Sequence, residues 1–195
     1  LSPAAAPPPF PAMLKIRGGG ITQDAITIAD SGTLTTAADK IAINKDVTEK
    51  QVTNNGSLTL NSDKETTLGY SVIDDEDKKG SLTIAGNIAL GDNTINQNLL
   101  TINNGALFTA DASDLTIASG SITNNGSLTF TGGTNNNAIT GEKGTLNITG
   151  EVINTAEIAQ NGLTIAAADE DSLAGSLTTS ADSLSIASGS ITNNG

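Results

Sequence analysis

The stretch Ile122-Thr123-Asn124-Asn125-Gly126-Ser127-Leu128-Thr129-Phe130 organises this 195-residue chain. It predicts a short strand, a tight corner and a second short strand, because apolar and hydroxyl residues alternate on both sides of an Asn-Asn-Gly bend. Nearly the same nine residues occur at Val52–Leu60, and the first five recur at Ile191–Gly195. The copies start 70 and 69 residues apart, so the chain holds about two and a half copies of one long repeat.

A smaller element recurs inside each repeat, in which a hydroxyl residue stands between two apolar residues. This alternation predicts strands of about three to five residues that bury Leu and Ile on one face and expose Thr on the other. No window of the sequence has a sustained helical period. The element occurs at Ile26–Ile28, Leu58–Leu60, Leu82–Ile84, Leu100–Ile102, Leu115–Ile117, Leu128–Phe130, Leu163–Ile165 and Leu184–Ile186.

The low aromatic content favours one all-β architecture over another. Phe10, Tyr70, Phe108 and Phe130 are the only aromatic residues. A β-sandwich normally fills its centre with large rings, whereas a thin stack of rungs can be filled by Leu, Ile, Val and Ala. We therefore expect a parallel β-solenoid, in which each rung contacts only its neighbours.

An antiparallel, hairpin-based β-repeat is the alternative to the solenoid. A three-residue hairpin loop ending in Gly126 would pair Thr123 with Ser127 and Ile122 with Leu128, which also keeps the apolar residues on one face. The repetition, the short strands and the few aromatic residues favour the solenoid.

The composition divides the chain into an arm and one continuous solenoid that begins at residue 21. All five prolines lie within Leu1–Met13, and Gly18-Gly19-Gly20 follows, so residues 1–20 are expected to be a linker or an arm that packs on a neighbouring surface. The predicted units are a partial repeat at 21–51, repeats at 52–121 and 122–190, and the start of a further repeat at 191–195.

Four Asn-Asn-Gly segments are the predicted structural corners. Asn and Gly tolerate the positive φ that a sharp bend requires. We expect Asn side chains from successive rungs to stack and exchange hydrogen bonds. The corners are Asn54, Asn55 and Gly56; Asn103, Asn104 and Gly105; Asn124, Asn125 and Gly126; and Asn193, Asn194 and Gly195.

The charge balance argues against two classes of partner. The formal net charge is −12, and Lys143 is the only cation after Lys79, against ten carboxylates in the same span. Such a surface repels nucleic acid and anionic membranes. No apolar run approaches the roughly 20 residues that a membrane-spanning helix needs. The chain has no Cys and no His, and no cofactor is expected.

The acidic run Asp74, Asp75, Glu76 and Asp77 is the one weak candidate for a metal site. Four carboxylates in a row could bind calcium, which takes oxygen ligands. The run lacks the alternating spacing of known calcium loops and the glycine-rich nonapeptide of calcium-binding solenoids. An exposed loop is therefore the favoured interpretation, and it also applies to Asp169-Glu170-Asp171.

Three strings in this sequence resemble the rungs of autotransporter-type surface proteins and related bacterial adhesins. They are Ile122–Phe130, Gly144–Gly150 and Leu115–Gly120, and the resemblance covers roughly residues 21–195. It implies a right-handed parallel β-helix displayed outside a Gram-negative cell. It transfers no functional residue, because this class of passenger has none in common.

These patterns lead us to expect a non-catalytic, extracellular structural or adhesive module of a bacterial surface protein. It would act as a rod or as a self-assembling filament subunit. A solenoid that stops at the Gly195 corner leaves an open rung, so we expect either a fragment of a longer array or an end covered by a partner. The expected partners are another copy, joined end to end, or a host or cell-surface receptor.

The sequence is less consistent with two other functions. A polysaccharide lyase or hydrolase would need carboxylates, a base and aromatic platforms, but the chain has one Arg (Arg17) and one Tyr (Tyr70), so we do not expect an enzyme. A solenoid face could instead bind ice or glycan through outward hydroxyl groups. Outward Thr is also simply a good strand residue, and the Thr-x-Thr pattern is irregular. The candidates for that face are Thr59, Thr83, Thr101, Thr116, Thr129 and Thr164.

Overall fold

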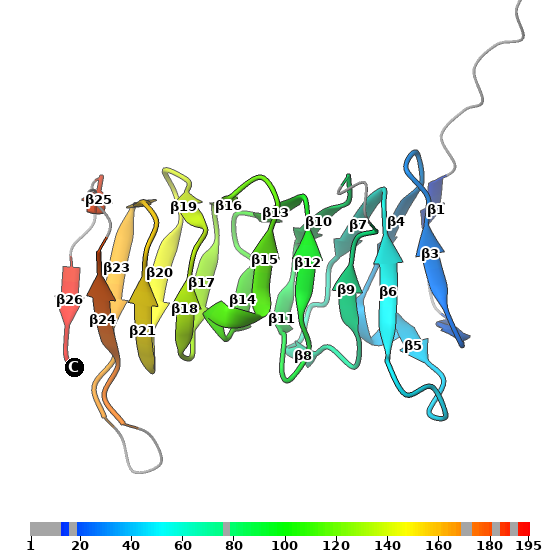
Figure 1. The fold of residues 1–195 in the computed structure, drawn as a ribbon, viewed down its shortest axis with the longest axis horizontal. Coiled ribbons are helices and arrows are strands. Elements are labelled where there is room, and N and C mark those ends of the chain that lie inside the picture. Colours follow the sequence, from blue (N-terminus) through cyan, green and yellow to red (C-terminus); the bar gives the residue numbers. More distant parts are fainter. Residues whose placement is uncertain (1–12, 16–18, 76–78, 169–172, 181–183, 188–190) are drawn as a thin grey trace, which may run out of the picture.

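The computed structural model describes residues 13–15, 19–75, 79–168, 173–180, 184–187 and 191–195. They form an all-β parallel solenoid of about 7 turns. Figure 1 shows the turns stacked along the long axis, from β1 (Met13–Lys15) at one end to β26 (Ile191–Asn193) at the other. Each strand pairs with the strands three places away in the chain, because three strands make one turn.

The predicted parallel solenoid is confirmed, and the hairpin alternative is wrong. All strand pairs between described residues are parallel, and Ile122 pairs with Leu100 and Ile139 of the two adjacent turns rather than with Leu128. The corner at Asn124–Gly126 turns the chain onto a different sheet. The two strands flanking it therefore cannot form a ladder with each other.

One sheet of nine strands runs the length of the solenoid. Its strands, in spatial order, are β1, β4 (Thr33–Thr36), β7 (Ser57–Leu60), β10 (Ser81–Ile84), β13 (Leu99–Ile102), β16 (Ser121–Asn124), β19 (Ala138–Thr140), β22 (Ile158–Gln160) and β25 (Leu184–Ile186).

A sheet of seven strands forms a second side of the solenoid. It contains β8 (Thr66–Thr67), β11 (Asn87–Ala89), β14 (Leu107–Ala110), β17 (Ser127–Phe130), β20 (Thr145–Ile148), β23 (Gly162–Ile165) and β26. A two-stranded sheet holds β2 (Ile21–Gln23) and β5 (Ile41–Ile43).

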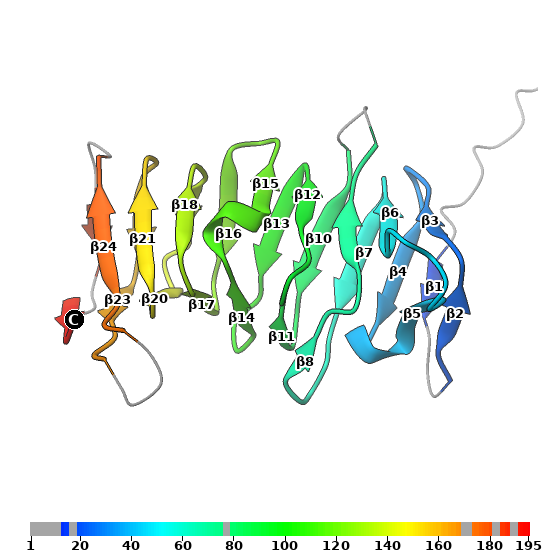
Figure 2. The ribbon, with the colours of Figure 1, turned by 60° about the horizontal axis from the view of Figure 1, so that its bottom comes forward.

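Two further sheets contain the remaining strands. Figure 2 shows β18 (Gly133–Asn135), β21 (Glu151–Asn154) and β24 (Ser176–Thr179) as neighbouring arrows. The five-stranded sheet holds β3 (Ile26–Ile28), β6 (Gln51–Asn54), β9 (Ser71–Ile73), β12 (Ile95–Gln97) and β15 (Leu115–Ile117), and the three-stranded sheet holds β18 (Gly133–Asn135), β21 (Glu151–Asn154) and β24 (Ser176–Thr179).

The core follows from the period-two alternation of the strands. Buried and half-buried residues alternate in most strands, with Leu and Ile inside and Thr or Ser outside, as predicted. The parallel register stacks residues of the same type on one another in successive turns. One interior column of the nine-stranded sheet consists of Leu34, Leu58, Leu82, Leu100, Ile122 and Ile139. Each such side chain contributes about 1.5–3 kcal/mol when fully buried.

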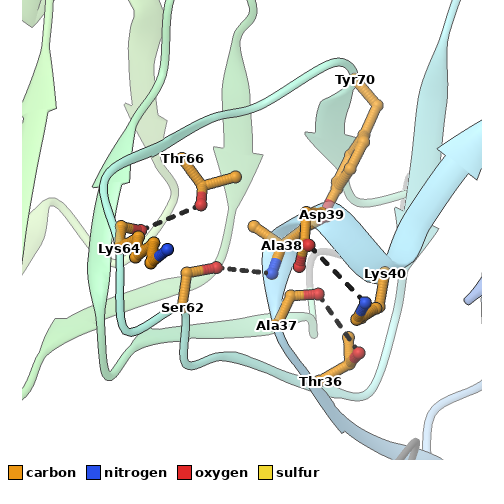
Figure 3. Close-up of polar contacts among 9 residues, drawn as sticks. All are labelled: Thr36, Ala37, Ala38, Asp39, Lys40, Ser62, Lys64, Thr66 and Tyr70. Carbon is orange, nitrogen blue, oxygen red and sulfur yellow. Dashed lines mark hydrogen bonds and ion pairs between the residues drawn. The ribbon is translucent and has the colours of Figure 1, made fainter. Parts of the chain in front are cut away.

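The described chain has two short 3₁₀ turns and no α-helix. They are η1 (Ala38–Lys40) and η2 (Ala112–Asp114). At η1, the Ala38 N–H donates to the Ser62 hydroxyl of the next turn (2.8 Å), as Figure 3 shows. The buried Tyr70 hydroxyl donates to the Ala38 carbonyl (3.4 Å). Burial, and secondarily the Asp39 carboxylate, raises the pKa of Tyr70 well above its ordinary value.

The sequence repeat does not coincide with the turns of the solenoid. The three copies of the organising stretch begin in β6, β16 and β26, which lie in three different sheets. Gln23, Gln97 and Gln160 likewise end β2, β12 and β22. The repeat therefore spans ten strands, or three turns and one strand, and each copy lies one side further around the solenoid.

A recurring arrangement of Asn, Gly and Gln in three successive turns fastens the corners, and we call it the corner clasp. In the first clasp, Asn54 Nδ2 donates to Gln97 Oε1 two turns away (2.6 Å). In the second, Asn124 Nδ2 donates to Gln160 Oε1 (2.6 Å). All four side chains are buried.

Glycine occupies the middle turn of each clasp because the crossing side chains leave no room for a Cβ. A Cβ on Gly80 would collide with the Asn54 carbonyl and Gln97 Oε1, and one on Gly144 would collide with the Asn124 carbonyl and Gln160 Oε1. The expectation that Asn side chains of successive turns stack and exchange hydrogen bonds is confirmed at Asn135, whose Nδ2 donates to Asn154 Oδ1 in the next turn (2.7 Å), but it is wrong at the two clasp corners. Asn54 and Asn124 instead reach a Gln across a glycine.

The segment predicted to be an arm contributes one strand to the stack. β1 pairs with β4, so Met13–Lys15 extends the nine-stranded sheet, while Met13 and Leu14 remain exposed. Residues 1–12 and 16–18 lie outside the described residues.

Candidate functional site

The strongest candidate for a binding surface is a column of threonines on the outer face of the nine-stranded sheet. Six consecutive strands place a Thr at the same position, each paired in register with the next. At about 4.8 Å per strand, the column is about 24 Å long. We call it the threonine column; its members are Thr35, Thr59, Thr83, Thr101, Thr123 and Thr140.

A second column two residues earlier in each strand is less regular. It carries hydroxyl groups in four strands and is interrupted by the exposed Leu99 and by Ala138. From β4 to β19 neither column contains a charged residue, although the chain carries a net charge of −12. The second column consists of Thr33, Ser57, Ser81, Leu99, Ser121 and Ala138.

The threonine hydroxyls face outward because the alternate residue of each strand belongs to the core. Thr123 is exposed and the other five are half-buried between their neighbours. Thr140 donates weakly to the Ile122 carbonyl (3.5 Å). The remaining five hydroxyls make no hydrogen bond to other described residues. They can therefore donate to and accept from water or a ligand on this face.

The structure divides the six predicted threonine candidates among three sheets. Thr59, Thr83 and Thr101 belong to the threonine column. Thr129 and Thr164 lie on the seven-stranded sheet, and Thr116 lies on the five-stranded sheet. On the seven-stranded sheet Asn147 stands between Thr129 and Thr164 and donates to Ser127 Oγ (2.9 Å), which interrupts the hydroxyl pattern.

Sequence reasoning missed Thr35, Thr123 and Thr140. Each follows an apolar residue in a short strand, so the local signal was present. The sequence contains no signal for the register of the strands, because the spacing between paired strands varies from 24 residues between Thr35 and Thr59 to 17 between Thr123 and Thr140.

Asp74 and Asp75, the two residues of the calcium candidate that the structure describes, make hydrogen bonds to other residues of the chain. Asp74 is buried and its Oδ2 accepts a hydrogen bond from the Gly80 N–H (2.6 Å); its Oδ1 is buried with no partner among the described residues. Asp75 is exposed and exchanges two hydrogen bonds with the Asn55 side chain. Glu76 and Asp77, like Asp169-Glu170-Asp171, lie outside the described residues.

An acidic groove of about 600 Å³ lies beside the outer face of the seven-stranded sheet. Asp92, Asp111 and Asp114 line it together with Thr67 and Thr109. Partial burial raises the pKa of the Asp114 carboxyl, and the neighbouring Asp111 and Asp92 raise it further. No three His, Cys, Asp or Glu side chains of the described residues lie close enough together to hold a metal ion.

The corner residues have unequal environments. Asn54 and Asn124 are buried within clasps, whereas Asn103 and Asn193 are exposed. At both Asn124 and Asn193, the side-chain oxygen accepts from the N–H of the Gly two residues later (3.1 Å).

The fold defines the class of protein as a parallel β-solenoid. No protein-family model, curated protein or solved structure matches the chain. Within the described residues there is no helix of the length and apolarity that a bilayer crossing requires.

Proposed function

We propose that this chain is a non-catalytic, extracellular structural or adhesive module of a bacterial surface protein. It acts as a rod or as the subunit of a self-assembling filament. The observation that carries the proposal is the in-register stack, in which identical residue types lie over one another through successive turns. The resemblance of Ile122–Phe130 to autotransporter and adhesin rungs supports a position outside a Gram-negative cell.

In a stack of this kind, the length of the rod increases in proportion to the number of turns. Each turn adds about 4.8 Å, so about 7 turns give a rod of roughly 34 Å, and further repeats would lengthen it without changing its cross-section. The two corner clasps each tie one turn to the second one along, from β6 to β12 and from β16 to β22, which opposes bending between those turns. The acidic charge keeps such a β-rich surface soluble.

Electron microscopy of the purified chain at several protein concentrations tests this proposal. Rods of constant length support a section of a surface adhesin, and filaments that lengthen with concentration support a filament subunit that binds its own copies. Compact particles without a long axis contradict both. Release of reducing ends from a panel of polysaccharides would contradict the non-catalytic assignment.

Adhesion needs its own measurement, because a rod need not bind a receptor. Beads coated with the native chain should adhere to host cells more than beads coated with the urea-unfolded chain. Equal adhesion of the two preparations would remove the adhesive role and leave the structural one.

The threonine column favours a second candidate, a face that binds ice or an ordered neutral glycan. A row of six evenly spaced hydroxyls, five of them without a partner among the described residues, carries no charge and matches a ligand that is itself periodic and uncharged. Thr101→Val keeps the shape of the side chain and removes the hydroxyl, and Thr129→Val makes the same change on the seven-stranded sheet. Thermal hysteresis, or retention on cellulose and chitin, should fall with Thr101→Val alone; its absence from the unmodified chain would refute this function.

A further inference from the structure

The chain contains five Asn-Gly pairs, which differ in their burial and hydrogen bonding in the folded structure. In an Asn-Gly pair the glycine nitrogen can attack the preceding side-chain amide, because glycine has no side chain to hinder the approach. The reaction needs a free carboxamide, a free glycine N–H and a backbone able to rotate. The pairs begin at Asn55, Asn104, Asn125, Asn161 and Asn194.

Two of the pairs are held tightly at buried or half-buried corners. The Asn55 carboxamide donates to Asp75 and accepts from the Asp75 N–H (3.1 Å), so both its nitrogen and its oxygen are bonded. The Gly126 N–H, which follows Asn125, donates to Asn124 Oδ1 (3.1 Å). A Cβ on Gly126 would collide with two carbonyls of the preceding turn, so this backbone has little room to rotate.

Two more pairs have the glycine nitrogen engaged. The Gly162 N–H, at the start of β23, donates to the Gly144 carbonyl just before β20 (3.4 Å), and the Asn161 N–H donates to the same carbonyl (2.9 Å). The Gly195 N–H, which follows Asn194, donates to Asn193 Oδ1 (3.1 Å).

In the fifth pair, Asn104-Gly105, both reacting groups lack a hydrogen-bond partner among the described residues. It forms the middle of a tight turn closed by the Ala106 N–H, which donates to the Asn103 carbonyl (3.0 Å). Asn104 and Gly105 are both exposed, and no described residue lies within 4 Å of a Cβ built on Gly105. Neither the Asn104 carboxamide nor the Gly105 N–H makes a hydrogen bond to another described residue.

We propose that Asn104 is a site of spontaneous self-modification, converting to aspartate and isoaspartate while the other Asn-Gly pairs of the native chain persist. Solvent hydroxide removes the Gly105 N–H proton, and the nitrogen attacks Asn104 Cγ to form a new N–Cγ bond. The Cγ–Nδ2 bond breaks and ammonia leaves with a proton from water. The resulting five-membered imide is reopened by water at either carbonyl, and nothing is oxidised or reduced.

The modification changes one specific corner of the solenoid. It adds a negative charge to an already acidic surface, and isoaspartate adds a backbone atom to the turn. The Asn103 and Ala106 carbonyls of this turn face Gly126 of the next turn. The change therefore occurs where two turns meet but outside the strands that hold the stack.

Peptide mapping after incubation of the native chain at mildly alkaline pH tests the proposal. Cleavage before aspartate separates residues 92–110, which carry Asn104, from residues 46–62, which carry Asn55. Tandem mass spectrometry locates the mass gain, and protein isoaspartate methyltransferase labels the isoaspartate. Each hydrogen bond that must open slows a pair about 2- to 12-fold, so Asn104 should react at least several times faster than Asn55 or Asn125.

The chain provides its own controls. In urea the corner geometry is lost, and Asn55, Asn104 and Asn125 should react at similar rates. Asn104→Gln should abolish early labelling of the native chain. A native rate at Asn104 equal to or below that at Asn55 and Asn125, or faster reaction of Asn104 that persists unchanged in urea, overturns the proposal.

Discussion

Removal of the Asn124 side chain by Asn124→Ala tests whether the corner clasp stabilises the solenoid. Asn124 Nδ2 donates to Gln160 Oε1 (2.6 Å) and to the Thr145 carbonyl (2.9 Å), and its Oδ1 accepts from the Gly126 N–H (3.1 Å). The side chain is fully buried, so water cannot replace these partners without opening the corner.

The size of the effect follows from the three hydrogen bonds. Each contributes about 0.5–1.5 kcal/mol net, and their buried partners are left unsatisfied, so we expect a loss of about 2–4 kcal/mol in the free energy of unfolding. Asn193→Ala is the matched control, because Asn193 belongs to the same sequence motif but is exposed and makes only the bond to the Gly195 N–H. It should cost less than about 1 kcal/mol.

Urea unfolding, followed by far-ultraviolet circular dichroism and by the fluorescence of Tyr70, provides the measurement. Tyr70 is the only Tyr and there is no Trp, so its emission reports one turn while circular dichroism reports the whole sheet. The two curves must coincide before a free energy is extracted, because stacked repeats can lose cooperativity.

A double-mutant cycle with Gln160→Ala isolates the Asn124–Gln160 bond. Residues in direct contact typically couple by about 0.5–3 kcal/mol, and we expect a value near 1 kcal/mol or above. Equal destabilisation by Asn124→Ala and Asn193→Ala, together with zero coupling, would falsify the clasp.

Three further predictions follow from the same geometry. Gly144→Ala should destabilise the fold by about 2–4 kcal/mol, because the new Cβ would collide with the Asn124 carbonyl and Gln160 Oε1 of the clasp. Gly105→Ala should cost about 1–2 kcal/mol, because Gly105 has a φ of +80° but space for a Cβ. Equal urea midpoints for the two variants would contradict this. Burial raises the pKa of Tyr70, so only the unfolded state ionises near pH 10, and stability should fall as pH rises above about 10; Tyr70→Phe should flatten that part of the melting-temperature profile. Deletion of residues 52–121 removes one whole sequence repeat, including both Asn54 and Gln97, and should keep the solenoid, as judged by circular dichroism. Deletion of residues 57–98 removes two whole turns and Gln97 but leaves Asn54 buried without its partner, so it should be less stable; the reverse order contradicts a ten-strand unit.

The local elements could be predicted from the sequence because each is set by its own residues. Strands such as Leu82–Ile84 and Leu128–Phe130 have apolar residues at alternate positions, and β-branched residues suit a pleated surface. The Asn-Asn-Gly bends mark where a strand must end. Few rings and many short strands then favoured a parallel stack, which the structure has.

The candidate surface could be predicted only in part. Thr59, Thr83 and Thr101 were correctly grouped with outward hydroxyls, but Thr129 carries the same local pattern and lies on another sheet. Nothing in a three-residue strand states which side of the solenoid it occupies. The number of strands that precede it decides this, together with loops of variable length.

The alternation of strands and corners and the 70-residue repeat can be recognised in the sequence, because they depend on residues adjacent in the chain. The winding of the repeat depends on the folded structure, since ten strands do not divide into turns of three and each copy lies on a new side of the solenoid. The clasps likewise depend on the folded structure and not on residues adjacent in the chain. Asn54 and Gln97 are 43 residues apart and Asn124 and Gln160 are 36 apart, so no fixed spacing reveals them, and they meet because parallel pairing brings each corner over the last.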